Sequence, residues 1–151
     1  MADIKTPEAR SINMSHIRNR DTKPEIYFRK LLFRDGYRYR TNVKGIEGHP
    51  DIFLAKYNTA IFINGCFWHR HEGCKYAYMP KSRIDFWADK FEKNINRDRQ
   101  VRDALLRDGI KCLVIWECTI KKMKKAPDFQ SCILMRAEDF IKSQNQNDLE
   151  L

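Results

Sequence analysis

Five side chains with sulfur or nitrogen donors stand at spacings that suit a bound metal ion. Cys66, His71 and Cys74 form a Cys-x4-His-x2-Cys segment, and Cys118 follows much later, directly after an apolar run. Three thiolates and one imidazole suit tetrahedral zinc, and a site filled by four protein ligands is structural. His69 lies between the same ligands and competes with His71 for the histidine position. The alternative is a group of buried free thiols, but so many donors in one short segment favour a structural zinc site.

The other two cysteines suit core positions. Cys112 lies within an apolar strand pattern, and Cys132 lies on the apolar side of the last predicted helix. The total of five thiols is odd, and the N-terminus MADIKTPEAR lacks the apolar segment of a signal peptide. We therefore expect no disulfide framework, and we predict a soluble, cytoplasmic protein whose thiols stay reduced.

Asp51 is a candidate ligand for a hard cation. Pro50-Asp51 opens a predicted hairpin whose second strand ends at Ile63-Asn64. Nucleases that use magnesium need a carboxylate to hold the ion on the scissile phosphate. An Asp at the start of one hairpin strand, with a second ligand near the end of the next, is the spacing of the restriction-endonuclease-like core. The structural alternative is an ordinary turn, in which Pro-Asp pairs are common.

Asp98 places a charge in an apolar helical pattern. At about 100° per residue it lies within about 20° of both Phe91 and Leu105 on a long predicted helix. A buried carboxylate without a partner is costly, so Asp98 must meet a cation, a donor or a wet cleft. The structural alternatives are a helix whose buried stripe ends early and an ion pair with a nearby arginine (Arg97, Arg99 or Arg102).

Aromatic side chains and positive charge point to a nucleic acid. Phe67 and Trp68 precede His69 among the expected zinc ligands. Rings on such a loop can stack on bases or wedge between them, and a histidine there can act as a general base; the alternative is that the rings belong to the core. The chain has 29 basic and 20 acidic residues, a net charge of +9. This balance favours a polyanionic partner, although many small basic proteins carry such charge for solubility alone.

The elements that position these residues follow from periodicity and capping signals. Thr22 and Glu25 form a capping box for a first helix that ends at Asp35-Gly36; in that box Glu25 needs no further function. Ser82 is predicted to cap a long helix that ends at Gly109, with a buried stripe of Ile84, Trp87, Phe91, Ile95, Leu105 and Leu106. The other predicted segments are a strand at 37–43, a hairpin at 51–55 and 59–63, an irregular loop at 64–80, a buried strand at 111–116, a basic loop at 121–125, and a last helix at 128–143.

The order of these segments predicts one α/β domain over residues 1–151, with a mixed β-sheet flanked by helices. Residues 1–20 are expected to form a basic N-terminal arm or a short helix, and the polar segment 144–151 is expected to be a disordered, frayed tail. No apolar run approaches the length needed to cross a bilayer, so no membrane association is expected.

Several of these motifs resemble the very short patch repair (Vsr) endonucleases. The most specific is Ile61-Phe-Ile-Asn-Gly-Cys-Phe-Trp-His69. The likeness spans roughly residues 10–118 in order. Its other motifs are Asn13-Met14, Arg20-Asp21-Thr22, Glu25, Gly48 to Asp51, His71, Cys74, Phe86-Trp87, Lys93-Asn94, Arg97-Asp98 and Trp116-Glu117-Cys118.

The resemblance implies a bacterial enzyme that nicks DNA at a thymine–guanine mismatch left by deamination of 5-methylcytosine. It implies a restriction-endonuclease-like fold, one structural zinc and catalytic magnesium. Asp51 and the backbone carbonyl of Ile63 would hold magnesium. His69 would act through water as the base, supported by Glu25 and Asp98. The zinc ligands would be Cys66, His71, Cys74 and Cys118, which assigns the histidine position to His71.

The resemblance also implies how DNA is bound. Phe67, Trp68 and Trp87 would form an aromatic wedge in the major groove, and Met14 would insert from the minor groove. Many relatives carry a second active-site histidine where this chain has Asn64, and Gly73 is an extra residue in the zinc loop. An asparagine can hydrogen-bond a phosphate oxygen but cannot exchange a proton near neutral pH.

The expected partners are duplex DNA with a T:G mismatch and a mismatch-repair recruitment protein. The expected state is a monomer acting at the bacterial nucleoid. Two other hypotheses are an endonuclease of the same fold with different DNA specificity, and a non-catalytic zinc module that binds distorted DNA.

Overall fold

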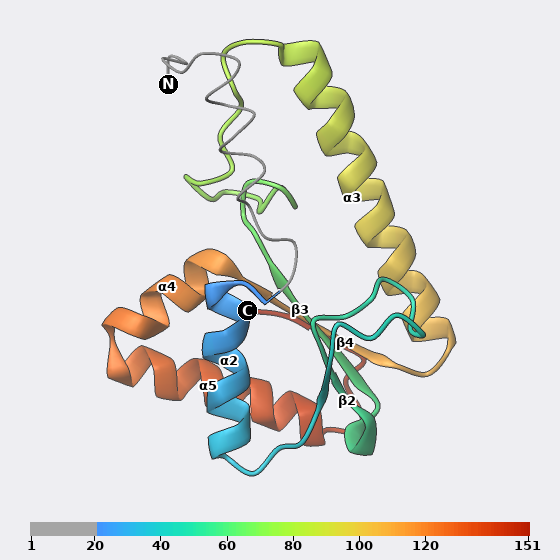
Figure 1. The fold of residues 1–151 in the computed structure, drawn as a ribbon, viewed down its shortest axis with the longest axis vertical. Coiled ribbons are helices and arrows are strands. Elements are labelled where there is room, and N and C mark those ends of the chain that lie inside the picture. The colour runs from blue at the N-terminus through green and yellow to red at the C-terminus, as the bar shows by residue number, and fades with distance from the viewer. Residues whose placement is uncertain (1–20) are drawn as a thin grey trace.

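The computed structural model describes residues 21–151. At its centre is a five-stranded sheet in the order β1-β2-β3-β4-β5 (Figure 1). The strands β1, β2 and β3 are antiparallel neighbours, whereas β3, β4 and β5 run parallel. The strands are β1 (Arg40–Thr41), β2 (Ile52–Leu54), β3 (Thr59–Asn64), β4 (Lys111–Trp116) and β5 (Asp148–Glu150). The predicted mixed sheet and its hairpin are confirmed.

Helices cover the two faces of the sheet unequally. The helices α2 (Lys23–Arg34), α4 (Glu117–Lys125) and α5 (Pro127–Lys142) pack on one face, around the larger core. Helix α3 (Ile84–Arg107) meets the other face near its C-terminal end and extends away from the sheet (Figure 1). Side chains of a strand alternate between faces, so Ile52 and Leu54 join the larger core and Phe53 the smaller one.

The first helix starts where its capping signal predicts. The Glu25 N–H donates to Thr22 Oγ1 at 3.4 Å, and Pro24 lies in the first turn, where no backbone donor is needed. The helix ends at Arg34, and Gly36 follows with a φ of 95°. The N-terminus of α2 therefore places Glu25 at the side of the sheet where β3 ends.

Helix α3 begins later and is less buried than its sequence pattern predicts. Its first residue is Ile84, and Arg83 precedes it with a left-handed φ of 55°, so the prediction that Ser82 caps the helix is wrong. Phe91 and Leu105 are buried, but Ile84 is 54% exposed. Of the other stripe positions, Trp87 and Leu106 are half-buried and Ile95 is exposed. The helix extends past the sheet, and its N-terminal half lies beside the irregular loop 65–80 instead.

The C-terminal tail is ordered, contrary to the prediction. Asp148–Glu150 forms β5 against β4, and the backbone continues the ladder, because the Leu151 N–H donates to Val114 O at 2.8 Å. Leu151 is buried and Leu149 packs on the larger core. Two leucines and a free edge of β4 therefore hold a segment whose other residues are polar.

Three smaller predictions also need correction. The basic segment 121–125 belongs to helix α4, and strand β1 covers only Arg40–Thr41 of the predicted 37–43. Cys132 is exposed, whereas Cys112 is buried as predicted. Within residues 21–151, no helix has the length and apolar content to cross a membrane.

Candidate active site and metal centre

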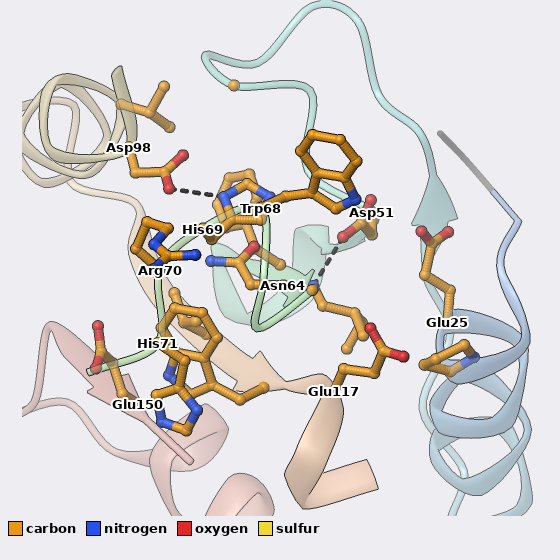
Figure 2. Close-up of a pocket in the computed structure, with 18 of the residues that line it drawn as sticks. Glu25, Asp51, Asn64, Trp68, His69, Arg70, His71, Asp98, Glu117 and Glu150 are labelled. Atoms are coloured by element: carbon orange, nitrogen blue, oxygen red, sulfur yellow. Dashed lines mark hydrogen bonds and ion pairs between the residues drawn. The ribbon is translucent and has the colours of Figure 1, made fainter. Parts of the chain in front are cut away.

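One pocket brings together all the residues predicted to be catalytic. It is bordered by Glu25, Asp51, Asn64, His69 and Asp98 (Figure 2). They come from distant parts of the chain: the start of α2, the start of β2, the end of β3, the loop after β3, and the middle of α3. The pocket lies where β3 ends, so the hairpin and the two helices bring these side chains together.

Asp51 is fixed against the neighbouring strand. The Ile63 N–H donates to Asp51 Oδ2 at 2.7 Å, which turns the carboxylate toward the end of β3. Burial raises the pKa of Asp51 to about 7, and the negative charge of Glu25 adds to the rise. The Ile63 N–H and the positive charges of Arg29 and His69 oppose it. Asp51 is therefore a carboxylate whose negative charge is poorly compensated by the protein.

Glu25 is the second carboxylate of this side of the pocket. It is only 3% exposed, and burial raises its pKa, although the Asp21 N–H and Arg29 lower it. Two desolvated carboxylates, of which Glu25 raises the pKa of Asp51, create a negative potential. Hard oxygen donors in such a potential suit a divalent cation such as magnesium. Asp51 and Glu25 therefore fit the cation that the sequence predicts, and Ile63 borders the same pocket.

His69 and Asp98 form a dyad on the opposite side of the pocket. Nδ1 of His69 lies 2.7 Å from Asp98 Oδ2, and one turn earlier on α3 the Asn94 Nδ2 donates to the Trp68 carbonyl at 3.0 Å. A carboxylate that accepts from Nδ1–H leaves Nε2 as the acceptor of a proton. The Asp98 side chain is 35% exposed, so it lies at a wet cleft rather than within a buried stripe. The structure therefore pairs Asp98 with His69.

The Cys and His ligands converge on one point. The ligand atoms of Cys66, His71, Cys74 and Cys118 all lie within 4.8 Å of one another. His71 Nδ1 is 3.6 Å from Cys66 Sγ and 3.4 Å from Cys118 Sγ. Zn–S and Zn–N bonds of about 2.3 and 2.1 Å at a tetrahedral angle give an S···N edge of about 3.6 Å. The spacing therefore fits tetrahedral zinc, and the pairing of His69 with Asp98 leaves His71 as the histidine ligand.

Outer contacts support this metal centre. The Cys118 N–H donates to Cys66 Sγ at 3.4 Å, which links the loop after β3 to the start of α4. Burial raises the pKa of the Cys66 thiol, and the neighbouring Cys118 thiol raises it further, so a bound cation would help to hold Cys66 as a thiolate. The Trp116 ring stacks on His71, with centroids 4.2 Å apart and planes 7° apart. This role of Trp116 was not predicted from the sequence, although its position two residues before Cys118 was a usable signal.

The predicted wedge residues form one aromatic cluster with Phe67 at its centre. The Phe67 ring lies 5.1–5.7 Å from four other rings, those of Trp68, Tyr78, Trp87 and Phe91. Phe91 is buried, whereas Phe67, Trp68 and Trp87 are half-buried. Phe67 thus supports the cluster from within. Met14, the fourth predicted DNA-binding residue, lies outside the described residues.

Arg70 holds the loop that carries these rings, a role that the sequence analysis missed. Its guanidinium donates to the carbonyls of Phe67, Ala77 and Tyr78 at 3.3, 2.7 and 3.0 Å. Its Cζ atom also lies 3.9 Å from the centroid of the Phe91 ring on α3. Five fixed donors make arginine suited to collecting several carbonyls. Arg70 therefore ties both ends of the loop to α3 independently of the metal ligands.

Known proteins that are similar to this chain are DNA endonucleases, in agreement with the chemistry of the pocket. A family model described as DNA mismatch endonuclease Vsr matches residues 2–75. The chain is 47% identical over 121 residues to the type II nicking enzyme V.NmeAIP of Neisseria meningitidis, covering 80% of this chain and 86% of that protein. It is 36% identical over 141 residues to the DNA mismatch endonuclease Vsr of Escherichia coli, covering 93% of this chain and 88% of that protein. The chain therefore belongs to the Vsr family, with its restriction-endonuclease-like fold, and is a DNA endonuclease.

Proposed function

We propose that this protein is a magnesium-dependent endonuclease that nicks one DNA strand at a thymine–guanine mismatch left by deamination of 5-methylcytosine. Such a nick would initiate very short patch repair. The observation that carries the proposal is the pocket itself, in which Asp51 and Glu25 face the His69–Asp98 dyad. A cation site beside a general base is what hydrolysis of a phosphodiester needs.

The dyad has the geometry of a general base. Asp98 accepts from Nδ1 of His69 and holds the ring, so Nε2 takes the proton of a water molecule as its oxygen attacks phosphorus. The bond from phosphorus to one bridging oxygen then breaks, which leaves a hydroxyl and a phosphate at the nick. Magnesium, when held by Asp51, the Ile63 carbonyl and the nearby Glu25, supplies a positive charge that polarises the phosphate.

Asn64 has a different task from the histidine of many relatives. It stands at the end of β3 and borders the pocket. Its amide can donate a hydrogen bond to a phosphate oxygen, but it carries no proton to give to the leaving oxygen. Water must therefore supply that proton, and we expect slower nicking than an enzyme with a histidine there would achieve.

The metal centre and the aromatic cluster serve binding. Zinc at Cys66, His71, Cys74 and Cys118 would pin the loop after β3 to α4 and so present the rings of Phe67, Trp68 and Trp87 to the duplex. Aromatic rings inserted between bases favour sites that unstack easily, such as mismatches. The net charge of +9 supplies affinity for phosphates of any sequence. The proposal also includes insertion of Met14 from the minor groove. The protein would act as a monomer, with a mismatch-repair recruitment protein as its partner.

A second specificity is supported by the names of two relatives. V.NmeAIP and V.XorIIP of Xanthomonas oryzae, 39% identical over 123 residues, are type II nicking enzymes. These names support the alternative that this chain is an endonuclease of the same fold that nicks DNA at a different site. The pocket argues against the non-catalytic alternative, because a binding module needs neither Asp51 nor the dyad.

Labelled duplexes with and without a central T:G mismatch test the proposal. Each is incubated with the protein, with and without magnesium, and the products are resolved on a denaturing gel. Nicking of one strand of the mismatched duplex, only with magnesium, is expected. Nicking of both duplexes supports the second specificity, and binding without nicking refutes the catalytic proposal. Asp51→Asn is the matched control, because it keeps the size and hydrogen-bonding capacity of the side chain.

A further inference from the structure

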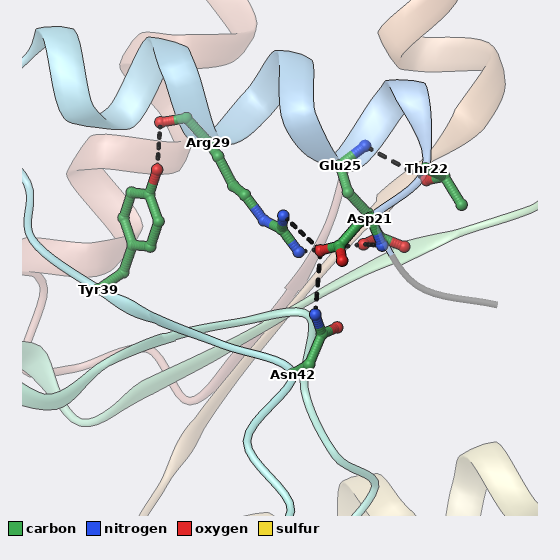
Figure 3. A network of polar contacts seen from close by, with 6 residues as sticks. All are labelled: Asp21, Thr22, Glu25, Arg29, Tyr39 and Asn42. Atoms are coloured by element: carbon green, nitrogen blue, oxygen red, sulfur yellow. Dashed lines mark hydrogen bonds and ion pairs between the residues drawn. The ribbon is translucent and has the colours of Figure 1, made fainter. Parts of the chain in front are cut away.

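A largely buried arginine links the Glu25 carboxylate of the pocket to the rest of the fold. Arg29 lies one turn after Glu25 on α2, and its Nη2 donates to Glu25 Oε2 at 3.2 Å. Its Nη1 donates to Asp21 Oδ1 at 2.8 Å (Figure 3). The side chains of Arg29 and Glu25 are only 12% and 4% exposed. Helix capping does not account for this arrangement, because a capping box needs no guanidinium.

The same network reaches the backbone of Asp51. Asn42 Nδ2 donates to Asp21 Oδ1 at 3.1 Å, and the Asn42 N–H donates to Asp51 O at 3.3 Å. The Asp21 N–H also donates to Glu25 Oε2 at 2.8 Å. The Tyr39 hydroxyl donates to the Arg29 carbonyl at 3.1 Å (Figure 3). The Glu25 carboxylate and the backbone of Asp51 are thereby held by one set of contacts that meets at Arg29 and Asp21.

This arrangement is costly unless it has a use. A guanidinium removed from water loses hydration, and Arg29 Nε is buried with no hydrogen-bond partner among residues 21–151. The effect of these contacts is to hold the Glu25 carboxylate in one orientation beside Asp51. Outer contacts that orient a metal-binding carboxylate are typically worth about 10- to 100-fold in metal affinity or activity.

We propose that Arg29 is a positioning residue that sets the direction of the Glu25 carboxylate toward Asp51, so that nicking depends on Arg29 through Glu25. This inference rests on the proposed role of Glu25 in nicking. It assigns Arg29 no contact with DNA and no part in moving a proton.

A double-mutant cycle tests the inference. Single-turnover nicking of the mismatched duplex, with enzyme in excess and magnesium saturating, is measured for Arg29→Met, Glu25→Gln and the double variant. Arg29→Met should lower the rate about 10- to 100-fold, with DNA affinity within about twofold of the parent. In the Glu25→Gln background the same substitution should change the rate less than about threefold, because its target is gone. Arg29→Lys should recover part of the loss, since it keeps the charge but not the forked donors.

Two further variants keep the result interpretable. Arg34→Met removes an exposed arginine of the same helix, paired with Asp35, and should leave the rate within about twofold. If Arg29→Met does not fold, Asn42→Gly replaces it, because glycine tolerates the φ of 51° at this position while losing the side-chain bond to Asp21. Asn42→Gly should slow nicking severalfold, again only when Glu25 is present.

The possible failures are distinct. If Glu25→Gln is impaired and the loss from Arg29→Met is undiminished in the double variant, the inference is overturned and the proposed function stands. If Glu25→Gln nicks at the parent rate, the proposed role of Glu25 fails, and the inference fails with it.

Discussion

The uncompensated charge of Asp51 predicts that removing it stabilises the magnesium-free protein. The pKa of Asp51 is raised to about 7 in the fold, above its ordinary value of 3.8. A carboxyl whose pKa is raised by folding contributes stability below its unfolded pKa, and this contribution is lost as the pH rises through the folded value. The parent should therefore lose stability between about pH 4 and pH 7, and Asp51→Asn should not lose this part.

The size of the effect follows from linkage. A pKa difference of about 3, at about 1.4 kcal/mol each, gives an upper bound of roughly 4 kcal/mol at pH 8. Asp51 is partly exposed, and water screens part of its charge, so we expect about 1–3 kcal/mol. Asparagine can still accept from the Ile63 N–H, so the hydrogen bond at 2.7 Å need not be lost. At about 2–4 °C per kcal/mol, Asp51→Asn should melt several degrees higher at pH 8.

Thermal unfolding followed by circular dichroism checks this expectation. Both proteins are melted from pH 4.5 to pH 8.5 in magnesium-free buffer without chelator, so that zinc stays in place. The difference in melting temperature should grow with pH, because only the parent gains the buried Asp51 charge as the pH rises. Added magnesium should then stabilise the parent, by about 2.7 kcal/mol at one hundred times its Kd, but not Asp51→Asn. Equal melting at pH 8, or equal stabilisation by magnesium, would refute the assignment of Asp51 as an uncompensated cation ligand.

Three further predictions concern the loop after β3. Cys118→Ser, which removes one sulfur of the metal centre, should reduce zinc below one per chain and lower both melting temperature and nicking, because metal binding contributes to folding; a zinc-free variant that melts and nicks like the parent contradicts a structural role. Phe67→Ala should lower the free energy of unfolding by about 2–4 kcal/mol, since its ring supports four others. Trp68→Ala should have nearly the melting temperature of the parent. In binding titrations, however, it should lose roughly 1–3 kcal/mol of its preference for mismatched over matched DNA. Equal melting losses for both variants would show that Trp68 is also a core residue. Arg70→Met should speed limited proteolysis in residues 75–80 and weaken binding to mismatched DNA, with zinc content unchanged, because three carbonyls lose their donor; unchanged proteolysis would show that the metal alone holds the loop.

The sequence predicted the parts of the site that depend on local spacing. The capping box at Thr22 fixes where α2 begins, and hairpin register then places Asp51 beside Ile63. Helical periodicity identified Asp98 as an unusual charge, and the structure pairs it with His69. The start of α2, the hairpin register and the position of Asp98 on α3 were predictable because each is set within one element or one tight turn, whereas the partner of Asp98 was not.

Other features depend on what an element packs against. The lysines at 121–125 suggest a loop by their charge, yet lysine is a good helix former, and Ile120 and Met123 of the same helix are buried against the larger core. The tail pairs with β4 because the sheet leaves that edge free, which no local pattern in the polar segment 144–151 shows. Arg29 and Arg70 look like surface arginines in sequence. Only the folded arrangement shows that Arg29 donates to the buried Glu25 carboxylate and Arg70 to carbonyls of the loop 65–80.

The burial of α3 was overpredicted, and its exposed N-terminal half matters for how the protein binds DNA. Apolar periodicity assumes that a helix lies on a core along its whole length. In α3 the C-terminal end does so through Leu105, whereas the N-terminal half extends from the sheet and leaves Ile84 and Phe86 about half exposed. The metal centre and Arg70 hold the loop 65–80 against that half, so the rings of Phe67, Trp68 and Trp87 rest on a support outside the main core. In the proposed function, such a support would let the wedge enter a duplex while Asp51 stays at the sheet, held by the Ile63 N–H. His69 follows Trp68 on the supported loop, and its contact with Asp98 on α3 holds it in place.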